Sequence, residues 1–546
     1  MSDVVNKQII LSCEKMETRV ALLENSKLEE YVIERYTDDV KVGSIYLGKI
    51  VNLQPSLQAA FVDIGTEKNA FLHYDDLMDS LKNIFEMQIA IVEKKKDLSD
   101  DERNRQIARL QDAIYSRQKR KISIENIPQF FPVGTELIVQ VIKGPIGTKG
   151  PRVSVDITIA GRFLVLMPFN NTVGISSKIE NKQERKRLKE ILSSLKIPEN
   201  IGLICRTIGE GKKEVYFKRD AELLLDAWQN VEERLSRSGG CCEIYREPDL
   251  ASRMARDFMT DEISGIIVDN KNAYRVIHSQ LKKYGGMKMA SKVKEYKGAE
   301  PIFDYFNINS QLYQLLGRVV SLPSGGYICI DETEALIAID VNSGRAGRKK
   351  IEQPELILRT NLEAAEEIAR QLRLRNVGGL VVIDFIDMKT EKDRDLIYHT
   401  MKNLIKDDKA RTKILPISQM GLMEMTRQRE QESLQSVIFD MCPYCKGSGH
   451  MKSCESMSVE IQRELNNITK DKKYKNAMLR VFVHPLVLQR LKEEDAELLQ
   501  EIEDKSTLHL SFRADDNLHF ESFKIIDEES EEQLFPVLAD KEYENK

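Results

Sequence analysis

The stretch GGLVVIDFIDM, residues 378–388, is the feature that most limits how this chain can fold. A continuous apolar run of this kind is typical of a strand that is buried on both faces of a sheet. Asp384 interrupts the run, and an ionised carboxylate there is costly unless a cation or a hydrogen bond compensates it. The stretch therefore predicts a fully buried strand whose charged group needs a partner.

A second predicted strand, TEALIAID at residues 333–340, ends on Asp340. Between the two strands lies NLEAAEEIARQLRLR, residues 361–375, whose apolar residues recur on one face of a helix. A strand–helix–strand passage places both strands in one sheet, where they can be neighbours. Asp340 and Asp384 can then share one hard cation.

Magnesium suits such a pair of carboxylates. This ion takes one or two protein carboxylates, keeps several waters and completes its shell with phosphate oxygens. It can activate water and offset charge in a phosphoryl transition state. Asn342, two residues after Asp340, can orient a carboxylate or a water. The pattern indicates a candidate metal site for phosphodiester chemistry.

A simpler interpretation is that Asp340 starts an Asx turn and Asp384 bonds to its neighbours. Asp384 favours the metal site, because ionisable groups are almost never fully buried unless they are paired. Arg345 and Arg348 can bind phosphates. Asp387 is a weaker candidate ligand, since three residues further along a strand it should face the opposite side.

Length and composition bound the rest of the chain. The 546 residues predict several domains, and 41% hydrophobic with 31% charged residues is typical of a globular protein. The net charge of −5 argues against a uniformly basic nucleic-acid coat but allows a local basic groove. We expect a cytoplasmic protein, because we find no membrane-length apolar run, no signal-peptide pattern and no disulfide-framework spacing among the eight cysteines.

The order of strands and helices divides the chain. Residues 1–38 read as short alternating strands that need a partner elsewhere, and the period-two strands from about residue 40 suit a small barrel. A charged helical stretch at 78–126 interrupts the barrel. We expect a solvated hairpin there rather than a dedicated RNA arm, because charge runs usually face water. From about residue 300, alternating strands and helices indicate an α/β unit.

Seven motifs follow one another along nearly the whole chain. They are GSIYLGKIVNLQPSLQAAFVDIG, AGRFLVLMPFNNTVGIS, GLICRTIGEGK, TEALIAIDVNSGRAGR, TNLEAAEEIARQLRLRNVGGLVVIDFIDM, GLMEMTRQR and CPYCKGSG. In sequence and in order they resemble the ribonuclease E/G family of bacterial endoribonucleases, and its short ribonuclease G type most closely.

The resemblance implies a multidomain α/β fold. An RNase H-like domain would hold an inserted OB-type RNA-binding barrel and a 5′-sensor module, and a DNase-like α/β catalytic domain, a Cys-Pro-x-Cys zinc link and a small α/β domain would follow. The implied boundaries are 1–39 and 219–300 for the RNase H-like domain, 40–158 for the barrel with its insertion, 159–218 for the sensor, 301–437 for the catalytic domain, 438–454 for the zinc link, 455–526 for the small domain and 527–546 for an acidic tail.

The resemblance also implies a Mg²⁺-dependent endonuclease that cuts single-stranded RNA and leaves a 5′-phosphate and a 3′-hydroxyl. Its roles would be ribosomal and transfer RNA processing and messenger RNA decay. Asp340 and Asp384 match the family's metal-holding pair, and Asn342 matches a companion at the catalytic site. A non-catalytic RNA-binding scaffold is the alternative, and an exonuclease is a third possibility. We expect no large decay complex assembled through the short acidic tail.

RNA contacts follow from the same resemblance. Such barrels stack bases on exposed aromatic side chains beside basic ones. Phe61 and Phe71 match RNA-contacting aromatics, although Phe61 alone would be assigned to the core, and Lys149 is a candidate phosphate contact. Arg206 and Thr207 match a pocket for a 5′-monophosphate, where an arginine fork can bind phosphate through two hydrogen bonds.

Cys442 and Cys445 supply two of the four ligands that structural zinc requires. They can form an intrachain knuckle with His450 and Cys454, they can be redox-active or inert, or two chains can each donate one pair. The resemblance implies the third arrangement, with a zinc-linked homodimer or a homotetramer built from two dimers. His450 and Cys454 keep the knuckle open as an alternative.

Overall fold

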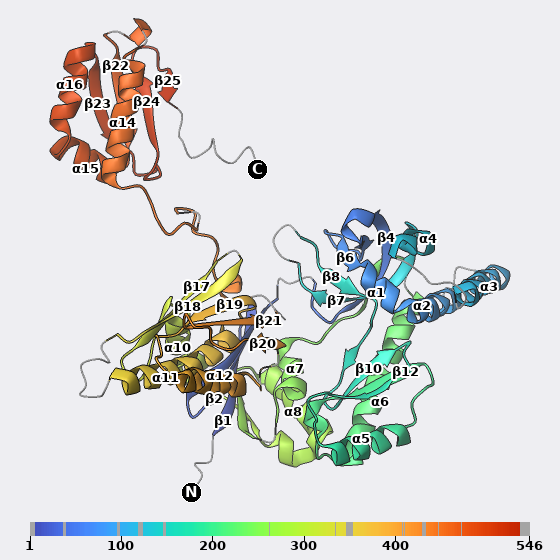
Figure 1. Cartoon of the computed structure of the whole chain (residues 1–546). Coiled ribbons are helices and arrows are strands. Elements are labelled where there is room, and N and C mark those ends of the chain that lie inside the picture. The colour runs from blue at the N-terminus through green and yellow to red at the C-terminus, as the bar shows by residue number, and fades with distance from the viewer. Residues whose placement is uncertain are drawn as a thin grey trace. The chain divides into compact units, whose positions relative to one another are not determined.

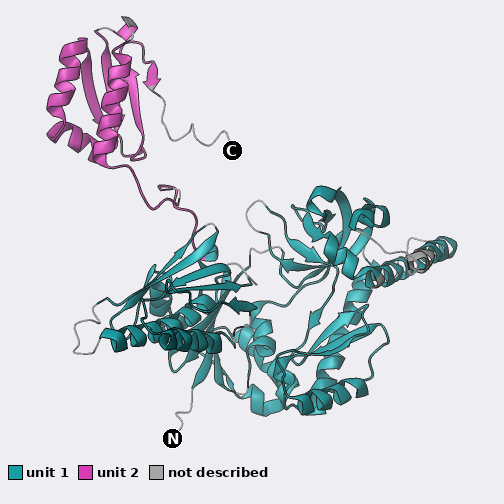
Figure 2. Cartoon of the chain, viewed as in Figure 1, with its two compact units in different colours: residues 1–437 teal, residues 438–546 magenta. Residues whose placement is uncertain are grey.

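The computed structural model folds into two compact units, residues 1–437 and 438–546 (Figure 2). Among the residues that it describes, no helix is long and apolar enough to cross a membrane. The described residues are 6–36, 40–94, 99–117, 124–145, 149–237, 239–260, 262–333, 335–344, 353–406, 408, 410–428, 433–445, 447–470, 472–474 and 476–535.

The first sheet joins the start of the chain to a much later segment. Its strand order is β15-β14-β1-β2-β3, with β1 antiparallel to β2 and parallel to β14. Helices α7 and α8 share a core with Ile9 and Leu11 of β1. The N-terminal strands thus find in β14 the partner that they need. The elements are β1 (Lys7–Cys13), β2 (Glu17–Glu24), β3 (Lys27–Arg35), α7 (Leu250–Asp257), β14 (Ile263–Val268), α8 (Lys271–Ala290) and β15 (Val293–Glu295).

A second sheet closes on itself. Strands β4, β5, β6, β8 and β7 pair in that order, and β7 pairs back to β4, so five strands form the OB-like barrel that was predicted. The strand β13 adds to β4 outside the ring. The elements are β4 (Ile45–Gln54), β5 (Ala59–Asp63), β6 (Ala70–His73), α1 (Tyr74–Asp79), α4 (Ile127–Phe130), β7 (Glu136–Lys143), β8 (Arg152–Ser154) and β13 (Cys242–Tyr245).

The predicted charged insertion forms two helices between β6 and β7, α2 (Leu81–Lys94) and α3 (Asp100–Arg117) (Figure 1). Most side chains of α3 that the structure describes are exposed, as expected for a solvated helix. Helix α2 differs, because Ile84 and Phe85 pack into the barrel core while Met87 and Ile91 pack into the core of the next module. The insertion is therefore anchored through one apolar helix face rather than solvated throughout.

The next module is a four-stranded sheet of order β11-β12-β10-β9. Two long helices share its core, in which Leu188 of α5 and Phe217 of α6 are fully buried. The elements are β9 (Ile159–Ala160), β10 (Leu164–Pro168), β11 (Val173–Ile175), α5 (Lys182–Ser194), β12 (Ile201–Cys205) and α6 (Glu214–Arg237).

A six-stranded sheet of order β16-β17-β18-β19-β21-β20 carries the two predicted aspartates. Helices α11 and α12 share a core with the buried residues Ile339, Val341 and Ile383 of β18 and β19. The elements are α9 (Ile302–Tyr305), α10 (Ile308–Leu315), β16 (Val319–Ser321), β17 (Tyr327–Glu332), β18 (Leu336–Asn342), α11 (Gln353–Leu374), β19 (Gly379–Asp384), α12 (Glu391–Ile405), β20 (Thr412–Ile414), β21 (Leu422–Arg427) and α13 (Leu434–Ile438).

The prediction that the run around Asp384 is a fully buried strand is wrong. In β19 only Val381 and Ile383 are buried, whereas Leu380 is 41% exposed and Asp384 is exposed. Alternate residues of this strand face α11 and α12, and the other residues face the open side of the sheet. The carboxylate of Asp384 is therefore available to solvent and to a ligand.

The second unit is a small α/β domain, as predicted. Its sheet has the order β23-β22-β24-β25, with β22 parallel to β23 and antiparallel to β24. Three helices share one core with this sheet. The elements are α14 (Cys454–Ile468), β22 (Met478–Val483), α15 (Pro485–Glu493), α16 (Ala496–Ser506), β23 (His509–Ala514), β24 (Phe523–Asp527) and β25 (Gln533–Phe535).

Candidate active site

Two parallel strands place the predicted carboxylates side by side. In the register of β18 and β19, Asp340 lies directly opposite Asp384. Both side chains are exposed, on the sheet face opposite the helix-covered core. The Asn342 side-chain amide donates a 2.6 Å hydrogen bond to Asp340 Oδ2. The three residues that the sequence proposed for this site thus come together.

The electrostatics of the pair favour a cation. The pKa of Asp384 is raised above its usual value, first by partial burial and then by the negative charges of Asp340 and Asp387. No lysine or arginine within the described ranges forms an ion pair with Asp340 or Asp384. Two adjacent carboxylates without a basic partner repel each other, and a divalent ion would relieve that repulsion.

The sequence makes Asp387 a weaker candidate ligand, because three residues further along a strand it should face the opposite side. The strand β19 ends at Asp384, so the alternation does not extend to Asp387, and its charge acts on Asp384. The periodicity of the sequence does not indicate that β19 ends at Asp384. The other candidates of this loop region, Arg345 and Arg348, lie outside the described residues.

Asn361 is a site residue that sequence reasoning missed. It is fully buried in α11, and its side-chain amide donates to the Ile386 carbonyl at 2.8 Å while its oxygen accepts from the Ile386 amide at 3.1 Å. These two bonds hold the chain just after Asp384. The available signal was a polar residue on the apolar face of the predicted helix.

Gly344 lies in the turn that follows β18, two residues after Asn342. Its φ of +51° lies in the left-handed region, and a Cβ there would lie 2.5 Å from the Gly325 carbonyl oxygen. A larger residue would strain the turn and push against the β16–β17 hairpin.

The barrel brings the two predicted aromatics together. Phe61 and Phe71 are cross-strand partners on β5 and β6, with ring centroids 6.1 Å apart at an interplanar angle of 82°. Both rings are half-buried, so they offer edges and partial faces to a base. Arg152 of β8 pairs with Phe71 across the strands, and Lys149 is exposed. Sequence reasoning did not single out Arg152.

The predicted phosphate pocket lies where β12 ends. Arg206 follows the strand and its side chain is 31% exposed. The hydroxyl of Thr207 lies 3.2 Å from the hydroxyl of Ser176, in the loop after β11. Helix α5 braces both loops, because Arg185 donates to the Ser176 carbonyl at 2.8 Å and Glu184 accepts from the Gly211 amide at 2.8 Å.

The bond from Arg187 is the first cause that lowers the pKa of Glu184, to about 2. The two residues form two hydrogen bonds of 2.6 and 2.7 Å. Glu184 therefore stays ionised at neutral pH and remains an acceptor for the Gly211 amide.

The two cysteines of the predicted zinc link lie in one short loop. Amide groups of Gly449 and Gly447, and then the Cys442 side chain, lower the pKa of the Cys445 thiol. Such amides favour a thiolate, which is the form that binds zinc. In the part of the chain that the structure describes, no three His, Cys, Asp or Glu side chains form a group that could hold a metal. Cys442, Cys445, His450 and Cys454 are thus not assembled into a knuckle.

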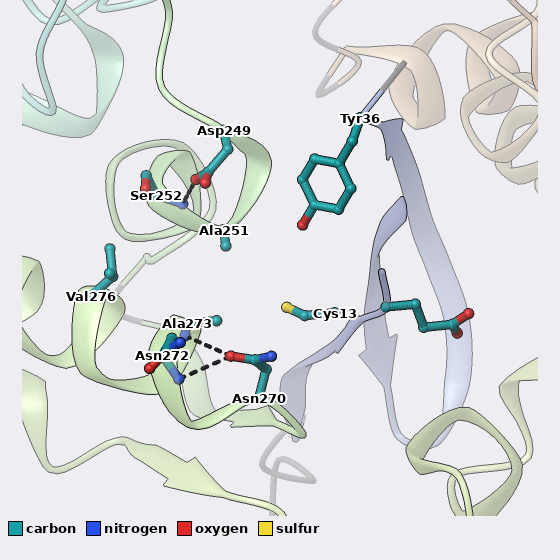
Figure 3. A pocket seen from close by; sticks show the side chains of 10 residues that line it. Cys13, Tyr36, Asp249, Ala251, Ser252, Asn270, Asn272, Ala273 and Val276 are labelled. Atoms are coloured by element: carbon teal, nitrogen blue, oxygen red, sulfur yellow. Dashed lines mark hydrogen bonds between the residues drawn. The ribbon is translucent and has the colours of Figure 1, made fainter. Parts of the chain in front are cut away.

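A cavity of about 270 Å³ lies elsewhere, between the end of β1 and helices α7 and α8. Cys13 and Tyr36 face these helices across it (Figure 3). Asp249 and Asn270 instead cap the helices by accepting backbone N–H bonds. Burial raises the pKa of Cys13 to about 12, so this thiol stays protonated. Neither Asp340 nor Asp384 is among the residues that line this cavity.

Comparison with known proteins identifies the family of this chain. Residues 158–430 match the model of the Ribonuclease E/G family, and residues 441–530 match a thioredoxin-like domain of RNase E/G. Ribonuclease G of Escherichia coli K12 is 36% identical over 497 residues, covering 91% of this chain and 94% of the relative. Ribonuclease G of Haemophilus influenzae is 35% identical over 498 residues, with the same coverage.

Ribonuclease E of Buchnera aphidicola is 38% identical over 460 residues, which span 84% of this chain and 44% of that relative. The chain belongs to the ribonuclease E/G family. The resemblance seen in the motifs, and the prediction of an endoribonuclease, are thereby confirmed.

Proposed function

We propose that this protein is a Mg²⁺-dependent endoribonuclease that cleaves single-stranded RNA to 5′-phosphate and 3′-hydroxyl products. The observation that carries the proposal is the exposed pair Asp340 and Asp384 in register on adjacent parallel strands. These carboxylates would hold the ion, and Asn342 would fix the orientation of Asp340. Bound Mg²⁺ would supply activation of water and charge compensation at the scissile phosphate.

Cleavage of a 5′-monophosphorylated single-stranded oligonucleotide tests this proposal. Asp340→Asn and Asp384→Asn should each lower the rate by at least about 10³-fold, since the ion supplies several kcal/mol to the transition state. Asp395→Asn on the exposed side of α12 is the matched control and should cut normally.

Each other outcome of that assay has a distinct meaning. Unchanged cutting by Asp340→Asn contradicts the metal assignment. No cutting by the wild type, together with retained RNA binding, favours the non-catalytic scaffold. A ladder of products that differ by one nucleotide indicates an exonuclease instead of discrete internal cleavage.

The barrel would hold the RNA strand near the cut. Phe61 and Phe71 would stack bases, and Lys149 would contact a phosphate, as the surface position of each allows. Arg206 and Thr207 would bind the 5′-monophosphate of preferred substrates. Processing of ribosomal and transfer RNA and decay of messenger RNA are the roles we propose for this activity.

Two chains would share zinc through Cys442 and Cys445, giving a homodimer or a homotetramer. The lowered pKa of the Cys445 thiol supports zinc binding at this loop. We propose the cytoplasm as its location, because all eight cysteines are free thiols, as a reducing compartment would keep them.

A further inference from the structure

The proposed phosphate-binding arginine is already held by the protein. Arg206 Nη1 donates to the Gly161 carbonyl at 2.5 Å and to Asp257 Oδ1 at 3.2 Å, and Nη2 donates to the same Asp257 oxygen at 3.3 Å. Asp257 is the last residue of helix α7, which shares a core with the first sheet. Hydrogen bonds to Gly161 and Asp257, from other segments of the first unit, therefore fix the position of the Arg206 guanidinium.

A count of donors shows what is left for a ligand. A guanidinium has five N–H groups, and three of those of Arg206 point at Gly161 and Asp257. Nε–H and the second N–H of Nη2 have no partner among the described residues. These two donors lie on one edge of the guanidinium plane, which is the edge that binds a phosphate or carboxylate through two parallel bonds.

Both groups that grip Arg206 are themselves fixed. Asp257 accepts from Arg256 through both oxygens, at 3.0 and 2.8 Å, and Arg256 also bonds to Glu247 at 2.6 Å. Burial alone would raise the pKa of Asp257, but the bonds from Arg256 and Arg206 outweigh it and lower the pKa.

Gly161 is fixed from the other side. The buried Asp220 accepts the backbone amides of Arg162, Phe163 and Leu164, and a Cβ on Gly161 would lie 2.6 Å from its carboxylate. The Gly161 carbonyl therefore has little freedom to move away from Arg206.

We propose that Asp257 is a positioning residue for 5′-end selection. Its carboxylate binds Nη1 and Nη2 of Arg206, and this leaves Nε–H and the second N–H of Nη2 on one edge of the guanidinium to bind a terminal phosphate monoester. This inference rests on the proposed binding of the 5′-monophosphate by Arg206. A 5′-hydroxyl end offers no pair of acceptors to that edge, so Asp257 should affect only phosphorylated substrates.

The test compares kcat/KM for one oligonucleotide with a 5′-monophosphate or a 5′-hydroxyl. Asp257→Ala should lower the value for the 5′-phosphate form by about tenfold, through KM, and leave the 5′-hydroxyl form within about twofold. An Arg206→Gln background should abolish the effect of Asp257→Ala, because Asp257 acts through Arg206. Glu233→Ala, which breaks the exposed ion pair with Arg237, is the control and should change neither value.

Asp257→Glu is a second variant that controls for misfolding, because it keeps the negative charge beside Arg256 but displaces the carboxylate. Its preference for the 5′-phosphate substrate should fall between those of the wild type and Asp257→Ala. Equal losses for both substrates, a stronger 5′-phosphate preference in Asp257→Ala, or an effect that persists with Arg206→Gln would overturn the inference. Equal cleavage of both substrates by the wild type would instead contradict the proposed binding of the 5′-monophosphate by Arg206.

Discussion

At the scale of single residues, the two neighbouring carboxylates place like charges close together. Asp340 and Asp384 face each other with no ion pair to a lysine or arginine in the described part of the chain. The pKa of Asp384 is raised, first by partial burial and then by the negative charges of Asp340 and Asp387. A raised folded-state pKa means that the ionised carboxylate opposes folding above that pKa. The opposition disappears below the pKa of the unfolded chain, about 3.9 for aspartate.

Asp384→Asn should therefore be slightly more stable than the wild type at pH 7 without divalent ions. The gain should be below about 1 kcal/mol, because solvent screens exposed charges. Thermal melts in a chelator measure it, and the difference should shrink as the pH falls from 7 to 4. A variant that melts below the wild type at pH 7 would show that this carboxylate stabilises the fold.

Asn361→Ala should destabilise the catalytic domain and slow cleavage. The substitution leaves the Ile386 amide and carbonyl without their partner, at about 1–3 kcal/mol for each buried group that stays unpaired. We expect kcat to fall more than RNA affinity, since the position of Asp384 changes rather than the RNA surface. Asn230→Ala on the exposed face of α6 is the matched control, and an equal effect there would contradict the role of Asn361.

At the scale of elements, helix α2 changes how the insertion is understood. Ile84 and Phe85 contribute to the barrel core, while Met87 and Ile91 contribute to the core of the module with Arg206. One helix thus connects the barrel and the module of Arg206 through buried side chains. Helix α3 contributes mostly exposed side chains over the part that is described.

Ile91→Ala should lower the melting temperature of the first unit, with a loss of about 2–5 kcal/mol, because it opens a cavity in a packed core. Ile107→Ala on the half-exposed side of α3 should cost about 1 kcal/mol or less. Differential scanning calorimetry of the two variants distinguishes them. Similar losses for both would indicate that the hairpin folds as one unit on its own.

The sequence could predict the elements whose signals are local. The strands around Asp340 and Asp384 follow from apolar runs, and their neighbourhood follows from the helix between them. The exposure of one face of β19 could not be predicted, because a run of apolar residues has the same pattern whether one or both faces of the sheet are covered by other elements. Asp387 was misplaced because strand ends are set by tertiary hydrogen bonds. The hydrogen bond between Arg206 and Asp257 joins residues that are far apart in the sequence, so no local pattern predicts it.

At the scale of the whole molecule, the cysteine loop belongs to the second unit. The His519 ring lies 4.3 Å from the Tyr444 ring and bonds to the Tyr444 carbonyl at 2.6 Å, and the Tyr444 hydroxyl accepts from the Phe520 amide at 3.2 Å. Tyr444 stands between the two cysteines in sequence. The small domain therefore presents Cys442 and Cys445 on a fixed support.

Zinc content distinguishes a shared ion from an internal one. We expect about one half zinc per chain, with Cys445→Ser losing both zinc and the dimer, because two cysteines from each of two chains complete four ligands. Cys454→Ser should retain both. Elemental analysis with light scattering makes the measurement, and about one zinc per chain that is lost in Cys454→Ser would favour the internal knuckle.

The pairing of β1 with β14 has a consequence for synthesis on the ribosome. The strand β14, which pairs with the second edge of β1, emerges about 250 residues after β1, between Cys13 and Val268. At about 5–20 residues per second, β1 waits roughly 10–50 seconds with one hydrogen-bonding edge unpaired. An open apolar edge is a template for wrong pairing with another chain. The nascent protein should therefore depend on a chaperone, or on low crowding of ribosomes, during that interval.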